Sequence, residues 1–152
     1  MNSTTRFVLL RHDVPRGAEP LTGGRALHWD LMLETAGVLH TWALAEQPYP
    51  AGTNCLAERL ADHRLLYLDY EGEVSGGRGT VSRLDGGIYT PVDNGESKVV
   101  VRLNGASFRG TATLARSDDQ RWRFSFVSDG TAASGLAGAS TVGDPSDSRG
   151  TV

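Results

Sequence analysis

The chain has few of the residues that mark secreted or membrane-embedded proteins. It holds one cysteine, Cys55, so an internal disulfide cannot form, and Cys55 has no partner motif that would suggest a nucleophile. No run of about 18 apolar residues is present, which argues against a membrane-spanning helix. The segment 1–6 lacks the basic start and apolar core of a signal peptide. We therefore expect a cytoplasmic protein that does not contact a membrane.

An excess of positive charge is also missing. The 15 lysines and arginines face 18 aspartates and glutamates, which gives a formal net charge of −3. Binding along a duplex depends on many Lys and Arg contacts to phosphates, so this composition argues against a protein that coats long DNA. A local pocket for one phosphate or one strand end remains compatible with the charge.

What the sequence does contain is a series of short apolar segments separated by glycine-rich turns, with 19 glycines in 152 residues. This pattern predicts an all-β fold, a single small antiparallel β-barrel with short helical segments at most. The barrel would occupy residues 1–128. Residues 129–152 bring together Ser, Gly, Ala, Thr and Asp without an aromatic residue, so we expect a disordered tail there.

The predicted strands and turns can be placed along the chain. Residues 55–61 fit a short helix or a strand equally well, and residues 63–70 could be extended. We expect strands at 6–12, 28–34, 38–44, 79–84, 87–92, 97–103, 107–116 and 121–127, with turns at 85–87, 93–95, 104–105 and 117–119. The glycine-rich loop at 71–78 lacks the strand–loop–helix context of a nucleotide-binding P-loop.

The segment from His28 to Glu34 alternates strictly between polar and apolar residues. Trp29 and its alternate neighbours would face the core, while His28 and Asp30 would share the other face. An imidazole and a carboxylate two residues apart on a strand suit a divalent metal. By itself, however, this alternation is more typical of an ordinary half-buried strand.

The four histidines extend this pattern. Three of them lie beside an acid, in His12-Asp13, His28-x-Asp30 and Asp62-His63, whereas His40 has no acidic neighbour and is interpreted as structural. Two histidines and a carboxylate give enough protein ligands for an open metal site. In a small barrel, inward-facing polar residues on adjacent strands would converge on one pocket. An iron oxygenase site that combines His28-x-Asp30 with His63 is an alternative.

Several blocks of the chain together resemble the 3′-phosphoesterase domain of bacterial DNA ligase D. The resemblance covers roughly residues 6–127, and its two most specific blocks are residues 27–43 and 62–72. The matching segments are His12-Asp13, Leu27-His28-Trp29-Asp30-Leu31-Met32-Leu33-Glu34, Gly37-Val38-Leu39-x-x-Trp42-Ala43, Asp62-His63-x-Leu65-x-Tyr67-x-Asp69-Tyr70-Glu71-Gly72, Gly79-Thr80-Val81, Asp85-x-Gly87 and Arg109-Gly110 followed by Trp122.

This resemblance implies a manganese-dependent enzyme of DNA repair by non-homologous end joining. It would remove a terminal ribonucleoside and then the 3′-phosphate from primer–template or nicked DNA, leaving a 3′-hydroxyl. The implied metal ligands are His12, His28 and Asp30, and the implied catalytic contacts to the phosphate are His63 and Tyr67. The chain would be a stand-alone member, so any ligase or polymerase partner would act in trans.

The chain departs from the family at three positions that usually carry positive charge, which are Met32, Glu46 and Cys55. A thioether, a carboxylate and a thiol cannot make charge-assisted bonds to phosphate. Phosphate-binding charge would then come from Arg11, Arg16 and Arg25, and Met32→Arg would raise activity if the missing arginine limits it. A catalytically weak or inactive module that binds metal and DNA ends or a protein partner is the alternative function.

Overall fold

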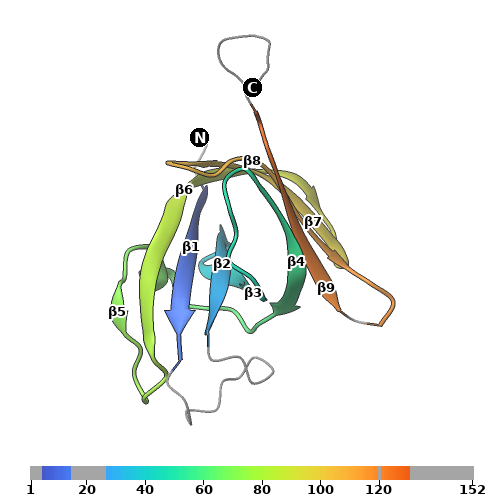
Figure 1. Ribbon diagram of the computed structural model, residues 1–152. Helices are drawn as coiled ribbons and strands as arrows, with labels where there is room; N and C mark the ends of the chain where they lie inside the picture. The colour runs from blue at the N-terminus through green and yellow to red at the C-terminus, as the bar shows by residue number, and fades with distance from the viewer. Residues whose placement is uncertain (1–4, 15–26, 120, 131–152) are drawn as a thin grey trace.

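The computed structural model describes residues 5–14, 27–119 and 121–130 (Figure 1). Nine antiparallel strands and one 3-10 helix make up this part of the chain. They are β1 (Thr5–Asp13), β2 (Leu27–Thr35), β3 (Val38–Leu44), β4 (Gly52–Arg59), η1 (Leu65–Leu68), β5 (Gly72–Glu73), β6 (Thr80–Asn94), β7 (Lys98–Gly105), β8 (Arg109–Arg116) and β9 (Trp122–Ser128).

Eight of these strands close into a barrel, as the sequence predicted. The strand order is β1-β2-β3-β4-β9-β8-β7-β6, and β1 pairs with β6 to complete the ring. The short β5 pairs with the N-terminal end of β6, at Thr80 and Val81. Closure gives each barrel strand a hydrogen-bonded neighbour on both sides.

The barrel interior is filled by one large apolar cluster. Every barrel strand contributes to it through alternate residues, as expected from the two-residue period of a strand. Its members are Phe7, Leu9, Trp29, Leu31, Leu33, Trp42, Leu44, Cys55, Ala57, Tyr89, Val99, Val101, Leu103, Phe108, Ala112, Leu114, Trp122, Phe124 and Phe126. The barrel interior is therefore lined by apolar side chains in the part of the chain that the structure describes.

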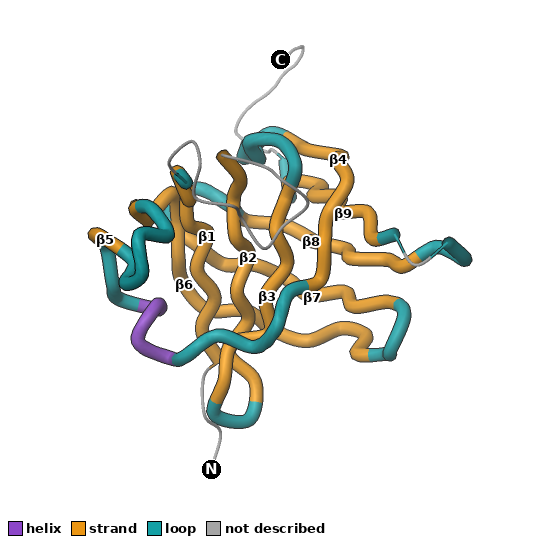
Figure 2. Tube along the Cα trace, turned by 90° about the horizontal axis from the view of Figure 1, so that it is seen from below, coloured by secondary structure: helices purple, strands orange, loops and turns teal. Residues whose placement is uncertain are grey.

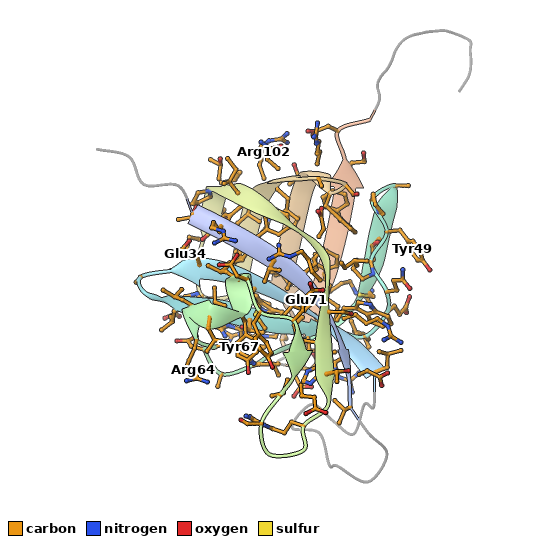
Figure 3. All side chains as sticks on the ribbon, turned by 90° about the vertical axis from the view of Figure 1, so that its left-hand side faces the viewer. Glu34, Tyr49, Arg64, Tyr67, Glu71 and Arg102 are labelled. Atoms are coloured by element: carbon orange, nitrogen blue, oxygen red, sulfur yellow. The ribbon has the colours of Figure 1, made fainter. Side chains whose placement is uncertain are left out.

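A second, smaller apolar cluster lies on the outer surface of the barrel. It joins outward-facing residues of β1, β2, β3 and β6 to the segment that contains η1, and its members are Val8, Leu10, Met32, Leu39, Leu68, Val74 and Val81. Tyr67 and Tyr70 pack against it. Figure 2 shows the 3-10 helix running past the outside of the strands, and Figure 3 shows Tyr67 on this side of the molecule.

Two arginines of the barrel fasten the end of η1 to this outer surface. Arg6 on β1 contacts Asp69 at 2.7 Å, and Arg83 on β6 donates to the carbonyl oxygen of Leu68. The contact with Arg6 lowers the pKa of Asp69 below its ordinary value. The segment around η1 is therefore attached to two barrel strands by polar contacts as well as by apolar packing.

The predicted turn at 85–87 is wrong, because β6 runs without a break from Thr80 to Asn94. The pairing of β6 with β1 shifts register at this point, so the strand bends without ending. The buried Asp85 carboxylate accepts hydrogen bonds from the backbone N–H groups of Ala106, Ser107 and Phe108, at 2.7 to 3.1 Å. Asp85 thus orders the loop between β7 and β8.

Two ambiguous segments are resolved by contacts that are distant in sequence. Residues 52–59 form β4, because they pair with β9 along one edge and with β3 along the other. Residues 65–68 form η1, where an extended segment was considered. Most of the tail predicted at 129–152, along with Arg16 and Arg25, lies outside the described residues. Within the described part of the chain, no helix has the length and apolar character needed to cross a membrane.

Candidate functional site

The β1–β2 pairing brings three of the predicted site residues together. His12 and His28 are direct partners in this register, and their ring centroids lie 4.7 Å apart. Asp30 follows two residues after His28 and shares its face of β2. One nitrogen or oxygen atom from each of the three residues lies within 4.8 Å of the other two. The structure therefore groups the predicted metal ligands on two adjacent strands.

This group lies on the outside of the barrel wall, so the expectation of an inward-facing pocket is wrong. Trp29 and Leu31 point into the interior cluster, whereas Met32 belongs to the outer cluster. His28 and Asp30 share the parity of Met32 and therefore face outward. Both are nevertheless buried, with 2% of each residue exposed.

The Asp30 carboxylate is held between the two imidazoles. Its Oδ2 lies 3.4 Å from Nδ1 of His12, and its Oδ1 lies 3.3 Å from Nε2 of His28. Burial raises the pKa of Asp30, but the two histidines lower it by more, so the net direction is downward. The carboxylate is therefore ionised at neutral pH and is available as a ligand.

The orientation of the His12 ring is set from its other side. Its Nε2 lies 2.8 Å from the carbonyl oxygen of Arg78, which can only accept a hydrogen bond. Nε2 therefore carries the proton, and the lone pair of Nδ1 faces Asp30. A carbonyl that fixes the tautomer in this way is the usual support of a metal-binding histidine. Burial lowers the pKa of His12, but Asp30 and the Arg78 carbonyl raise it above its ordinary value, against an opposing effect of the Arg78 charge.

The donor set fits a divalent cation. Asp30 Oδ1 and His28 Nδ1 are buried and have no hydrogen-bond partner among the described residues. A buried carboxylate oxygen without a partner is costly, and a cation placed between the three side chains would satisfy it. Two imidazoles and one carboxylate suit manganese, iron or zinc and leave coordination positions open. His12, His28 and Asp30 are the residues that would hold the metal.

His63 and Tyr67 also come together, on the same outer side of the barrel. Backbone hydrogen bonds of 2.8 and 2.9 Å join His63 to Leu39 of β3, and its ring lies 5.8 Å from that of Tyr67. Nδ1 of His63 donates to the carbonyl oxygen of Ala61 at 2.8 Å, so Nε2 carries the lone pair. Tyr67 packs against the outer cluster that contains Met32, two residues along the same face from Asp30.

The structure places Arg11 and two of the positions that lack the usual family charge, Met32 and Cys55, in different surroundings. Arg11 has the opposite parity to His12 on β1, and its Nη1 lies 3.6 Å from Oδ2 of Asp13. Its phosphate-binding role stays a prediction, as do the roles of Arg16 and Arg25. Met32 is buried in the outer cluster and Cys55 in the interior one, where burial raises the pKa of its thiol.

Two contacts in this region could not be predicted from the sequence. His40 does have an acidic neighbour, because its Nε2 lies 4.0 Å from Oδ1 of Asp62, on the segment that runs antiparallel beside β3. Arg78 lies in the loop that we had only excluded as a P-loop, yet its carbonyl contacts His12. Neither contact leaves a local signal, since each joins residues far apart along the chain.

Comparisons with known proteins place the chain beside one family. Residues 23–116 match the family model described as DNA Ligase D 3′-phosphoesterase domain. The multifunctional non-homologous end joining DNA repair protein LigD of Mycobacterium tuberculosis is 32% identical over 124 residues, covering 69% of this chain and 16% of that protein. The LigD protein of Pseudomonas aeruginosa is 33% identical over 93 residues, covering 59% and 10%. The matched part of the chain thus spans at most about a sixth of these relatives.

Proposed function

This chain belongs to the DNA ligase D 3′-phosphoesterase domain family, and we propose that it is a manganese-dependent phosphoesterase that trims DNA 3′ ends. Its substrates would be DNA ends that carry a 3′-phosphate or a terminal ribonucleotide, and its product a 3′-hydroxyl. The observation that carries this proposal is the buried Asp30 carboxylate between His12 and His28, with one oxygen lacking a partner in the described structure.

The three ligand residues would fix the metal on a rigid part of the fold. His12 would offer Nδ1, since its Nε2 is engaged by Arg78, while Asp30 would offer the unpartnered Oδ1. When bound, the metal supplies Lewis acidity toward a non-bridging phosphate oxygen and lowers the pKa of a coordinated water. The adjacent, hydrogen-bonded strands limit the movement of all three ligands.

His63 and Tyr67 supply the groups that would contact the reacting phosphate. His63 in this tautomer can accept a proton at Nε2 and, once protonated, can donate it to an oxygen of the phosphate or of the leaving group. The Tyr67 hydroxyl can donate a hydrogen bond to a non-bridging oxygen.

A binding module without turnover is the second candidate, and the environment of Met32 favours it. Met32 occupies the position of a usual family arginine and is buried in an apolar cluster. A phosphate would therefore lack one charged contact, and electrostatic stabilisation is often the largest contribution to catalysis. This module would hold metal and bind DNA ends without cleaving them.

One experiment separates the two functions. Purified protein is incubated with manganese and a primer–template whose primer ends in a 3′-phosphate or a ribonucleotide, beside His28→Ala and Asp30→Asn. Trimming by the wild type that both variants lose supports the phosphoesterase. Manganese binding without trimming supports the module instead.

A control guards against an unspecific effect of charge. Asp118→Asn removes an exposed carboxylate in the turn between β8 and β9, and its activity should match the wild type. Trimming that survives Asp30→Asn would refute the assignment of the metal ligands. As part of the proposed function, a ligase or polymerase that acts in end joining would use the 3′-hydroxyl that the phosphoesterase leaves.

A further inference from the structure

We propose that the Arg78 side chain contacts the reacting phosphate and supplies positive charge that Met32 cannot supply. This inference rests on the proposed function and concerns the loop between β5 and β6, residues 74–79. Three observations carry it, which are the position of the loop, the way the guanidinium is held and the absence of an acidic partner.

The loop is held against the metal-ligand group by backbone contacts. The Arg78 carbonyl accepts the hydrogen bond from Nε2 of His12 at 2.8 Å, and the Gly79 carbonyl accepts one from the N–H of Val74. Gly79 has a φ of +94°, and a methyl group there would collide with the carbonyl oxygen of Asp13. The chain can pass this close to the end of β1 only with glycine, so the position of Arg78 beside His12 is well defined.

The guanidinium of Arg78 is oriented by its own loop. Its Nε donates to the carbonyl oxygen of Ser75 at 2.7 Å, and its Nη2 donates to Oγ of Ser75 at 3.3 Å. Nη1 has no hydrogen-bond partner among the described residues. A side chain held in this way loses less conformational entropy when it binds an anion, and a guanidinium offers paired N–H donors that match phosphate oxygens.

In the part of the chain that the structure describes, no acidic neighbour neutralises the positive charge of Arg78. Arg6, Arg59, Arg83 and Arg102 all form ion pairs, whereas no acidic group lies within ion-pair distance of Arg78 among the described residues. The side chain is exposed. An exposed cation next to a buried ligand set is available to a phosphate that approaches the metal.

Arg78 and Met32 lie on different sides of the ligand group. Met32 is on β2 beyond Asp30, whereas Arg78 lies in the loop before β6, and its carbonyl contacts His12 on β1. Charge from Arg78 would therefore reach the phosphate from the His12 side of the ligand group. The loop between β5 and β6 would therefore compensate for the positive charge that is missing at Met32 on β2.

The test measures phosphate recognition apart from turnover. Manganese-loaded protein is titrated by fluorescence anisotropy with two oligonucleotides, one ending in a 3′-hydroxyl and one in a 3′-phosphonate that cannot be hydrolysed. We expect the wild type to bind the phosphonate end more tightly than the hydroxyl end. In Arg78→Gln the ratio of the two affinities should fall about tenfold. Arg78→Lys should lie between the two, because it keeps the charge but not the paired donors.

Two controls isolate the side chain. Arg123→Gln removes an arginine on the outer face of β9 that hydrogen-bonds Asn54, and it should leave the preference unchanged. Manganese affinity of Arg78→Gln, measured by isothermal titration calorimetry, should match the wild type, because the carbonyl that contacts His12 is retained. Loss of manganese binding in this variant would show that Arg78 acts through His12 and would overturn the proposed contact.

The outcomes for this inference and for the proposed function differ. An Arg78→Gln variant with wild-type preference and wild-type kcat/KM overturns the Arg78 contact while the phosphoesterase stands. A preference that depends on Arg78 in a protein that trims no ends supports the contact and refutes the phosphoesterase. A wild type without any preference for the phosphonate end overturns the Arg78 contact.

Discussion

His12 and His28 face each other directly across the β1–β2 pairing, with ring centroids 4.7 Å apart and the Asp30 carboxylate in contact with both. Two histidines and one carboxylate on neighbouring strands form a site whose geometry is set by the sheet. Its first consequence is that the affinity for metal should depend on each of the three residues separately.

Asp30→Asn should weaken manganese binding by roughly 100-fold or more, since it removes the only charged ligand of the group. In calorimetric titrations the wild type would give a single site and the variant none in the same range. A thermal shift on adding manganese should likewise be seen in the wild type alone. Equal shifts in both proteins would mean that the metal binds elsewhere.

Metal affinity should fall as the pH decreases, because a proton and a cation compete for His12. The pKa of His12 in the metal-free protein lies above its ordinary 6.5, so the decline should begin at a higher pH than for an unperturbed histidine. Titrations with manganese between about pH 8 and pH 5.5 would follow it, with a limiting slope of about tenfold per pH unit for one proton. A flat profile would contradict the assignment of His12 as a ligand.

In the absence of metal, His12 should stabilise the fold more at low pH than at high pH. A raised histidine pKa stabilises the folded state fully below the unfolded value, about 6.5, and this contribution disappears as the pH rises through the folded value. Urea denaturation in the presence of a chelator should therefore show His12→Gln losing more stability, relative to wild type, at about pH 6 than at about pH 8. Equal losses at both pH values would refute this coupling.

Met32→Arg should destabilise the protein by about 3 kcal/mol or more, because Met32 is buried in the outer cluster. Its burial changes the expectation from the sequence alone, by which this substitution would raise activity. Met32→Leu is the matched control and should lower the free energy of unfolding by less than about 1.5 kcal/mol. A folded Met32→Arg variant with raised activity would restore the original expectation.

Asp85→Asn should lower the free energy of unfolding by about 2 to 4 kcal/mol, since an amide cannot replace the carboxylate that accepts three backbone N–H groups. Denaturation by urea would measure the loss. Manganese affinity should not change, because Asp85 supports the loop between β7 and β8. Asp93→Asn, on the exposed end of the same strand, should be neutral.

Tyr67→Phe should reduce kcat for 3′-phosphate removal by about tenfold to a hundredfold while leaving the melting temperature unchanged. The ring would still pack against the outer cluster, and only the proposed hydrogen bond to phosphate would be lost. Tyr70→Phe is a close control, since this neighbouring ring packs against the same cluster and its hydroxyl donates to Glu73. Equal activity of Tyr67→Phe and wild type would exclude a role for the hydroxyl.

The parts of the fold that follow local rules were predictable. The alternation around Asp30 predicted which side chains face the barrel core, because a strand has a period of two residues. The close approach of His12 to His28 depends on strand register, which periodicity cannot predict. The resemblance alone implied that the two histidines belong to one metal site. Cysteine burial at position 55 likewise depends on the pairing of β4 with β9.

Other features were decided by partners far along the chain. Asp85 followed by two glycines has the composition of a turn, but its carboxylate binds the loop at 106–108, about twenty residues away. The contact between His12 and Arg78 spans an even longer interval of sequence. No local pattern encodes such contacts, so the role of the loop between β5 and β6 is visible only in the folded protein.

The two faces of β2 assign structure and chemistry to residues of opposite parity, with Trp29 and Leu31 inside the barrel and His28 and Asp30 outside it. A substitution of His28 or Asp30 leaves the barrel interior filled, so the chemistry of this face can change while the barrel keeps its core. An inserted residue behaves differently, because it would exchange the two faces beyond that point. This strand should therefore tolerate substitutions over evolution far better than insertions or deletions.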